Sequence, residues 1–344
     1  TLALLAFELI RRLKLIRIVI NMNSLLYLSH ENVASVGLSM SEIIDTVEDA
    51  FLQKGLGEVE IPPKPGIHTQ PNAFIHAMPA YVPKLRAAGM KWVAGYPENY
   101  KRGLPYISGL LIMNDPKTGL PLCVMDCMWI TAKRTGAATA VAAKYLARQD
   151  SKSLGILGCG VQGRSNLEAL KAVFPEINLV KAYDIAPENL TCYIEEMQAK
   201  FGIKVMGVDS PQEAVIDSDI IVTAGPILKN PNPVIEPEWL KPGSFACPLD
   251  FDSYFKPDAF AAADKLYTDD LVQQQYYKHA GYFQKTPEVQ GDLGEIVAGQ
   301  KPGRQNDFER IISINLGLAL EDVAVGIKIY QQAKKKGIGQ KLPL

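Results

Sequence analysis

The stretch "KSLGILGCGVQGRSNLEAL", residues 152–170, decides the fold of this chain. A short apolar run leads into three glycines, and a helix-forming segment follows them. Gly158 permits a tight strand-to-helix turn, Gly160 leaves the backbone open to a pyrophosphate, and Gly163 lets the helix pack close to the strand. The amino end of such a helix offers unpaired N–H groups and partial positive charge to phosphates. The stretch therefore predicts a dinucleotide-binding turn.

An acidic residue supports this interpretation. The next strand-like run, residues 179–183, ends at Asp184, about 20 residues past the turn, where a carboxylate is expected to bind the ribose hydroxyls of NAD. A glycine turn alone is weak evidence, but strand, turn, helix, strand and acid in this order favour a cofactor site over a βαβ unit without a ligand. The predicted cofactor-binding residues are Gly158, Gly160, Val161, Gln162, Gly163, Asp184, Thr223 and Ala224.

Composition limits the possible size, partners and compartment of the protein. With 344 residues, 47% hydrophobic and 21% charged, the chain is long enough for two globular domains. A formal net charge of −1 gives no attraction to nucleic acid or to an anionic membrane. The five cysteines are scattered and odd in number, which favours a reducing compartment, and we expect a cytoplasmic protein. Cys123 and Cys127 lack a second pair or a nearby histidine, so we interpret them as buried thiols and predict no metal site.

The first 21 residues form a separate leader. Four basic residues interrupt its apolar run: Arg11, Arg12, Lys14 and Arg17. The run is therefore too interrupted to span a bilayer, and its charges follow the apolar segment, unlike those of a secretory signal. A mitochondrial-type presequence, a surface helix and non-native upstream sequence all stay open. We favour the last and exclude residues 1–21 from the fold.

The region from Met22 to the glycine turn mixes helix and strand patterns. Ser39 or Ser41 is a candidate cap for a helix over residues 42–54. Strand-like pieces follow at residues 73–82, 87–97, 106–115 and 121–129, then a helix rich in small residues at 131–147. The turn "NDPKTG" predicts that the last two strands form a hairpin.

Beyond the glycine turn, strand and helix patterns alternate, which predicts a parallel sheet of Rossmann type. Residues 311–332 read as one long helical pattern, and we infer that it returns to pack on the first region. The predicted fold class is α/β. A Rossmann domain, residues 135–312, is inserted into a mixed α+β domain made of residues 22–134 and 313–344.

Six stretches carry a family resemblance: "HAMPAYVP", "GMKWVAGYPEN", "GLPYISGLLIMNDPKTGLPL", "ITAKRTGAATAVAAKYLA", "LGILGCGVQGRSNLEAL" and "DLGEIVAGQKPGR". In this order and spacing the chain resembles the ornithine cyclodeaminase/μ-crystallin family, which includes archaeal-type alanine dehydrogenases and imine reductases. The resemblance covers nearly everything from Met22 onward. It implies that the first domain binds substrate and forms a homodimer, and that the Rossmann domain binds NAD. It also implies hydride transfer between the nicotinamide and Cα of a small amino or imino acid.

The resemblance also implies the substrate-binding residues. Lys91 matches the family's active-site lysine, and Arg134 matches its carboxylate-binding arginine. Lys64 stands where relatives carry a further arginine, and His76 is expected to border the substrate pocket. Four structural alternatives stay open: a solvated strand lysine for Lys91, an interdomain salt bridge for Arg134, a solvated loop lysine for Lys64 and a hydrogen-bonded structural residue for His76.

The stretch "GSFACPLDFDSYF" departs from the family pattern. Ornithine-specific relatives carry a glycine-rich segment with an aspartate here. Asp252 aligns best with that aspartate and is our second catalytic candidate beside Lys91, with Asp250 as the fallback. Bulky and aromatic residues in place of glycine predict a smaller or less polar pocket. We therefore expect a dehydrogenase or imine reductase, with an ornithine cyclodeaminase and a crystallin-type ligand-binding protein as alternatives.

Overall fold

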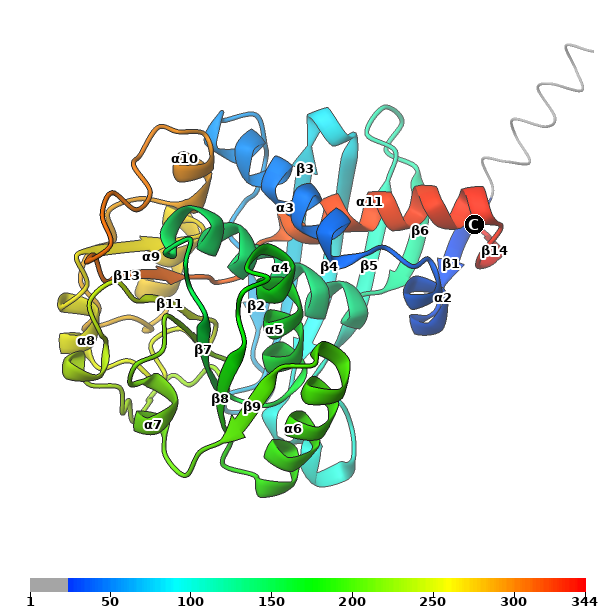
Figure 1. Cartoon of the computed structure of the whole chain (residues 1–344). Coiled ribbons are helices and arrows are strands. Elements are labelled where there is room, and N and C mark those ends of the chain that lie inside the picture. The colour runs from blue at the N-terminus through cyan, green and yellow to red at the C-terminus, as the bar shows by residue number, and fades with distance from the viewer. Residues whose placement is uncertain (1–23) are drawn as a thin grey trace, which may run out of the picture.

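The computed structural model describes residues 24–344, so the proposed leader lies outside the described residues. Two seven-stranded sheets make up the molecule, with the first on the right and the second on the left in Figure 1. Within residues 24–344, no helix is long and apolar enough to cross a membrane.

The first sheet is mostly antiparallel and has the order β14-β1-β6-β5-β4-β3-β2. Its strands are β1 (Ser24–Leu28), β2 (Gly66–Ile67), β3 (Phe74–Val82), β4 (Ala87–Gly95), β5 (Ile107–Asn114), β6 (Pro121–Asp126) and β14 (Gln340–Pro343). Strands β5 and β6 pair antiparallel, which confirms the hairpin predicted from "NDPKTG". The chain termini of the described region meet in this sheet, because β14 pairs with β1.

Helices cover one face of this sheet. They are α2 (His30–Ser35), which packs on β1 and β6, and α11 (Ala319–Lys336), which packs on β3, β4 and β5, whereas α3 (Met40–Gly55) packs on α11. Ser39, not Ser41, caps α3, because its side chain accepts a hydrogen bond from the backbone N–H of Glu42. The predicted apolar positions of this helix, such as Val47 and Phe51, are fully buried.

The second sheet is entirely parallel, with the order β12-β13-β11-β10-β7-β8-β9, and this confirms the Rossmann-type prediction. Its strands are β7 (Ser153–Leu157), β8 (Leu179–Tyr183), β9 (Lys204–Gly207), β10 (Ile220–Thr223), β11 (Phe245–Pro248), β12 (Lys265–Thr268) and β13 (Ile311–Ile314). Its helices are α5 (Val161–Val173), α6 (Pro187–Phe201), α7 (Pro211–Val215), α8 (Pro257–Ala261), α9 (Leu271–His279) and α10 (Leu293–Val297). The strand order reverses between β7 and β10, where open α/β sheets bind ligands at their carboxyl edge.

The prediction of one long helix over residues 311–332 is wrong in its first part. Residues 311–314 form β13, and α11 begins only at Ala319. A short buried run of isoleucines reads equally well as strand or helix, because periodicity cannot separate the two. Gly317 lies in the linker between them with φ +74°, a left-handed conformation that ends the strand and redirects the chain. The contact of α11 with the first sheet confirms that the helix returns there.

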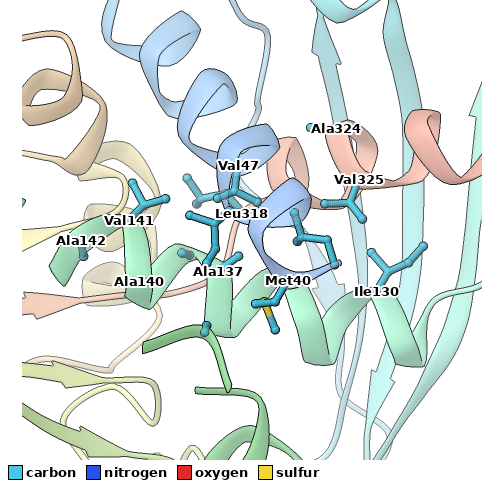
Figure 2. Close-up of a cluster of buried hydrophobic side chains, with 14 of the residues drawn as sticks. Met40, Val47, Ile130, Ala137, Ala140, Val141, Ala142, Leu318, Ala324 and Val325 are labelled. Carbon is cyan, nitrogen blue, oxygen red and sulfur yellow. The ribbon is translucent and has the colours of Figure 1, made fainter. Parts of the chain in front are cut away.

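Helix α4 (Met128–Leu146) lies between the two sheets and packs on both α3 and α5. Figure 2 shows its small side chains, including Ala137 and Val141, beside Met40 and Val47 of α3. A Cβ on Gly136 would lie 2.5 Å from the backbone oxygen of Ser165, so only glycine allows α4 and α5 to approach this closely. Helix α4 is thus a close-packed support for the polar residues on its first turns.

Candidate functional site

The glycine turn has the backbone geometry that the sequence predicts. Gly158 has φ +105°, and a Cβ there would lie 2.6 Å from the backbone oxygen of Ala224. A Cβ on Gly163 would lie 2.3 Å from the backbone oxygen of Gly158, so α5 packs in direct contact with the end of β7. At Gly160 a Cβ would meet nothing within 4 Å. Packing therefore requires the outer two glycines, whereas Gly160 leaves open space in front of the backbone.

Other predicted cofactor residues gather around this turn. The carboxylate of Asp184 accepts hydrogen bonds from the backbone N–H groups of Cys159 (2.7 Å) and Ala186 (2.8 Å), so it also anchors the turn. Gly160 caps α5 without a side-chain hydrogen bond, and Val161 on its first turn is 65% exposed. The amino end of α5 is therefore open on the side that a phosphate would occupy.

Thr223 and Ala224 lie at the carboxyl end of β10, next to the end of β7. The backbone N–H of Ala224 donates to the carbonyl of Leu157 at 2.7 Å, and the Thr223 hydroxyl donates to Asp250 at 2.7 Å. The structure thus places every predicted cofactor residue along one edge of the parallel sheet, at the point where the strand order reverses.

The sequence-predicted cations lie in a buried group that we call the charge cluster. Its members are at most 8% exposed and comprise three cations and three acids: Lys64, Lys91, Arg134, Asp269, Glu321 and Asp322. The three acids were not predicted from the sequence. A pair of adjacent acids, Glu321 and Asp322, inside the apolar stretch that forms α11 was the available signal.

Direct ion pairs join α11 to Lys91 and Arg134. Lys91 Nζ lies 2.7 Å from an oxygen of Asp322, and Arg134 Nε lies 3.1 Å from its other oxygen. Arg134 Nη1 also lies 2.6 Å from Glu321. Lys91 is therefore not a solvated strand lysine. The salt bridges of Arg134 join α4 to α11 within the predicted first domain, so they are not the interdomain bridge that the sequence left open.

The pKa values of these groups reflect burial and pairing. Burial and the neighbouring charge of Arg134 lower the pKa of Lys91, although Asp322 opposes this shift. Burial disfavours the charged form of Arg134, but the carboxylates of Asp322 and Glu321 outweigh it and raise the Arg134 pKa. Burial raises the pKa of Glu321. Arg134 is thus a fixed charge, whereas Lys91 is the cation of this pair that gives up a proton more readily than usual.

Lys64 is also buried, so the solvated-loop alternative is wrong. Its ammonium donates to the backbone oxygens of Leu316 (2.7 Å) and Gly317 (2.9 Å), in the linker between β13 and α11. Asp269 accepts a hydrogen bond from the N–H of Gly317 at 2.7 Å. Burial lowers the pKa of Lys64 to about 7, and burial together with Glu321 raises the pKa of Asp269 to about 7. The Gly317 peptide therefore lies between Lys64 and Asp269, two groups that are each only partly charged near pH 7 because their pKa values are about 7.

His76 lies on the same face of the first sheet as Lys91, on the neighbouring strand. Its ring stacks on Phe74 with ring centroids 4.2 Å apart. Burial, with a contribution from Lys64, lowers the pKa of His76 to about 3. The imidazole is therefore neutral near pH 7 and adds no positive charge to the cluster.

Asp250 and Asp252 differ in how they are held. Asp250 is fully buried and accepts hydrogen bonds from the Thr223 hydroxyl (2.7 Å) and the Gly225 N–H (2.8 Å). Asp252 accepts one bond, from the Phe283 N–H at 3.1 Å, and its second oxygen has no partner among the described residues. Burial raises the pKa of both carboxyls, that of Asp250 to about 7. Asp252 is thus the acid whose second, buried oxygen is paired with no described residue.

One residue connects the turn to the charge cluster. The Thr131 hydroxyl lies 3.3 Å from Lys91 Nζ, and the Thr131 carbonyl lies 3.5 Å from Nε2 of Gln162 on the glycine turn. A surface hollow of about 680 Å³ also flanks this turn, lined in part by Val161, Arg164 and Ala132. In residues 24–344, no group of three or more His, Cys, Asp or Glu side chains is arranged to hold a metal ion.

Three comparisons place this architecture among known proteins. An alanine dehydrogenase of Archaeoglobus fulgidus is 37% identical over 331 residues, which cover 92% of this chain and 98% of that protein. A Delta(1)-pyrroline-2-carboxylate reductase of Thermococcus litoralis, solved in complex with NADH and L-proline, has a TM-score of 0.83 and 35% identity, covering 92% of this chain and 99% of that chain. An archaeal alanine dehydrogenase dimer with bound NAD has a TM-score of 0.83 and 34% identity, covering 93% of this chain and 99% of that chain.

The family profile agrees with these similarities in sequence and in fold. It matches residues 26–337, which include the whole parallel sheet, the first sheet apart from β14 and the start of β1, the glycine turn and all six members of the charge cluster. The chain therefore belongs to the ornithine cyclodeaminase/mu-crystallin family.

Proposed function

We propose that this protein is an NAD-dependent oxidoreductase that interconverts a small α-amino acid and its imino or oxo acid. The observation that carries the proposal is the position of Thr131, which contacts Lys91 of the charge cluster and Gln162 of the glycine turn. A carboxylate bound at the cluster would therefore lie close to a dinucleotide bound at the turn. Family membership and the NAD and NADH named in two solved relatives support the same cofactor.

The residues present fit a dinucleotide. Gly160 leaves the space that a pyrophosphate requires, and α5 offers N–H groups that no side chain caps. Asp184 lies at the end of β8, where it is positioned to accept bonds from ribose hydroxyls. A nicotinamide bound there would supply hydride transfer to and from substrate Cα. The protein supplies the orientation and the charge.

The charge cluster fits a substrate carboxylate. Lys64 uses two of its ammonium protons on linker carbonyls, so one remains for a ligand. Arg134 adds a planar guanidinium, and Lys91 adds a second ammonium. Ion pairs with Glu321 and Asp322 hold Lys91 and Arg134 in fixed positions, so these cations are oriented before a substrate binds.

Lys91 and Asp252 are the proposed acid–base residues. The lowered pKa of Lys91 brings it closer to the working pH, which suits transfer of a proton to and from the substrate nitrogen or an attacking water. The oxygen of Asp252 that has no partner in the described chain is suited to hold the substrate ammonium. Oxidation then gives an imino acid, which water converts to an oxo acid and ammonia.

A homodimer is the proposed assembly. Trp92 and Leu110 pair across β4 and β5 and are 42% and 43% exposed. Lys91 points towards α11, and Trp92 is the next residue on the strand. The side chains of Trp92 and of its cross-strand partner Leu110 therefore belong to the sheet face opposite α11. A second copy of this chain would cover that apolar face, as a dimer is named for an archaeal relative. Sedimentation of Trp92→Glu as a monomer, with the wild type as a dimer, would support this assembly, and a monomeric wild type would exclude it.

The test of the function compares three reactions of the wild type. We expect NADH oxidation with pyruvate plus ammonia or with a simple cyclic imine such as pyrroline-2-carboxylate. That rate should exceed the conversion of ornithine to proline and ammonia with catalytic NAD. Faster proline formation would establish a cyclodeaminase instead. Thermal stabilisation by NADH without turnover across the panel would establish a crystallin-type binding protein.

A further inference from the structure

Four aromatic rings form a close-packed group beside the charge cluster, which we call the aromatic cluster: Phe251, Tyr277, Tyr282 and Phe283. The Phe251 ring centroid lies 4.8 Å from that of Tyr277, 5.4 Å from Tyr282 and 5.0 Å from Phe283. Tyr277 and Tyr282 are 5.6 Å apart in an edge-to-face arrangement. Phe251 and Phe283 are at most 2% exposed, so the rings behind Tyr277 have no room to retreat.

Tyr277 is the member of this group that reaches the charge cluster. Lys64 Nζ lies over its ring, 5.3 Å from the centroid. The His76 ring centroid lies 6.4 Å from that of Tyr277. A carboxylate oxygen hydrogen-bonded to Lys64 would be about 3 Å from Nζ. A ligand held by Lys64 is therefore within reach of the Tyr277 ring, whose centroid lies 5.3 Å from Nζ.

The element that carries Tyr277 is firmly held. Asp270 caps α9 by accepting from the Gln273 N–H, and the Gln273 side chain accepts from the backbone N–H of Lys64. Lys54 of α3 bridges Asp270 (3.1 Å) and Asp292 (2.6 Å), the caps of α9 and α10. These bonds tie the ring to the first domain as well as to the parallel sheet, so it is not free to swing away from a bulky ligand.

We propose that Tyr277 is a specificity-determining residue that restricts the substrate to a short apolar side chain. The inference rests on the proposed function and names its substrate class. The face of the ring offers apolar contact to a methyl or ethyl group on Cα. Its fixed position, backed by three further rings, excludes longer substituents by overlap.

The experiment measures kcat/KM for NADH oxidation with ammonia and 2-oxo acids of increasing length: pyruvate, 2-oxobutyrate, 2-oxohexanoate and phenylpyruvate. The wild type should prefer pyruvate over 2-oxohexanoate by roughly tenfold or more. Tyr277→Ala and the milder Tyr277→Leu should shift the ratio towards the longer acids by at least roughly tenfold. Tyr276→Ala is the matched control, because Tyr276 is the adjacent residue on α9, is 40% exposed and contacts the Tyr277 ring from outside.

The outcomes separate the two proposals. A ratio that stays unchanged in a folded Tyr277→Leu enzyme, or that shifts equally in Tyr276→Ala, overturns the role of Tyr277 and leaves the proposed function intact. A wild type that favours the longest acids overturns it as well, without any variant. A wild type that binds NADH, as followed by fluorescence, but turns over no acid or imine overturns the proposed function and this inference together. Thermal unfolding with NADH identifies variants that have lost their fold.

Discussion

The glycine turn and the charge cluster are two polar regions in contact through Thr131, yet they are built in opposite ways. The turn takes its main residues from one continuous segment, Gly158 to Asp184. Its glycines act through backbone geometry, and the Asp184 carboxylate accepts a hydrogen bond from the Cys159 N–H. The charge cluster takes its six residues from positions 64 to 322, and each depends on partners from other elements. A local motif tolerates the loss of a distant residue, whereas a dispersed cluster changes when any one member changes.

The largest effect is expected for Arg134, the fixed charge of the charge cluster, and it should appear in the KM for the acid substrate. Arg134→Lys keeps the positive charge but loses the planar fork that pairs with Glu321 and Asp322. Losing a charged hydrogen bond costs about 1.5–3 kcal/mol, so the KM for the acid substrate should rise roughly 10- to 150-fold. Affinity for NADH, measured by fluorescence titration, should change little because the turn is built separately. Arg148→Lys is the control, since Arg148 pairs locally with Asp150. An unchanged KM would remove Arg134 from the substrate site.

At the glycine turn we expect the opposite result, a loss of NADH affinity. Gly160→Ala meets no atom within 4 Å, so the free protein should unfold at the wild-type temperature. The new methyl group would instead occupy the space of the pyrophosphate, and the Kd for NADH should rise by about tenfold. Gly158→Ala serves as contrast, because its φ of +105° and the nearby Ala224 oxygen should lower stability as well. Equal NADH binding by Gly160→Ala would mean that the cofactor does not approach this glycine.

A smaller effect is expected for cofactor choice. Asp184→Ala should narrow the preference for NADH over NADPH by about tenfold, because the carboxylate no longer bonds the ribose or repels a 2′-phosphate. Since Asp184 also accepts bonds from Cys159 and Ala186, part of any loss in affinity should appear with both cofactors. The ratio of kcat/KM with NADH to kcat/KM with NADPH isolates the change in cofactor preference. Better use of NADPH by the wild type would contradict this assignment.

The smallest effect concerns pH at the margin of the charge cluster. Burial and Lys64 hold the pKa of His76 at about 3, below its ordinary value near 6.5, so the folded state resists protonation of the ring. As the pH falls below about 6.5, the unfolded chain takes up the proton first, and stability is lost progressively down to about pH 3. His76→Gln should flatten this slope by at most about 1.4 kcal/mol per pH unit, the value for one proton. Urea unfolding at several pH values between 4 and 7 measures it, and identical slopes would place His76 in an exposed, unperturbed setting.

Most of the fold could be predicted from the sequence, and the exception is the segment 311–318. Alternating strand and helix patterns, the hairpin turn at residues 114–119 and the Ser39 cap are local signals, and the structure follows each of them. The boundary at residues 311–318 was wrong because a buried isoleucine run has no periodicity that distinguishes strand from helix. Only the pairing of β13 with β11 and β12 decides its conformation.

For the site, the sequence alone predicted the dinucleotide turn and, through the family resemblance, the cations proposed to bind a substrate carboxylate. Glycine conformation and strand–turn–helix order are properties of one segment, so they can be read in order along the chain. The tertiary structure alone decided that Asp269, Glu321 and Asp322 neutralise those cations, and that Tyr277 stands over Lys64. Charge pairing and burial act between elements that are distant in sequence, and their strength depends on distances and desolvation that exist only once the two sheets are packed together.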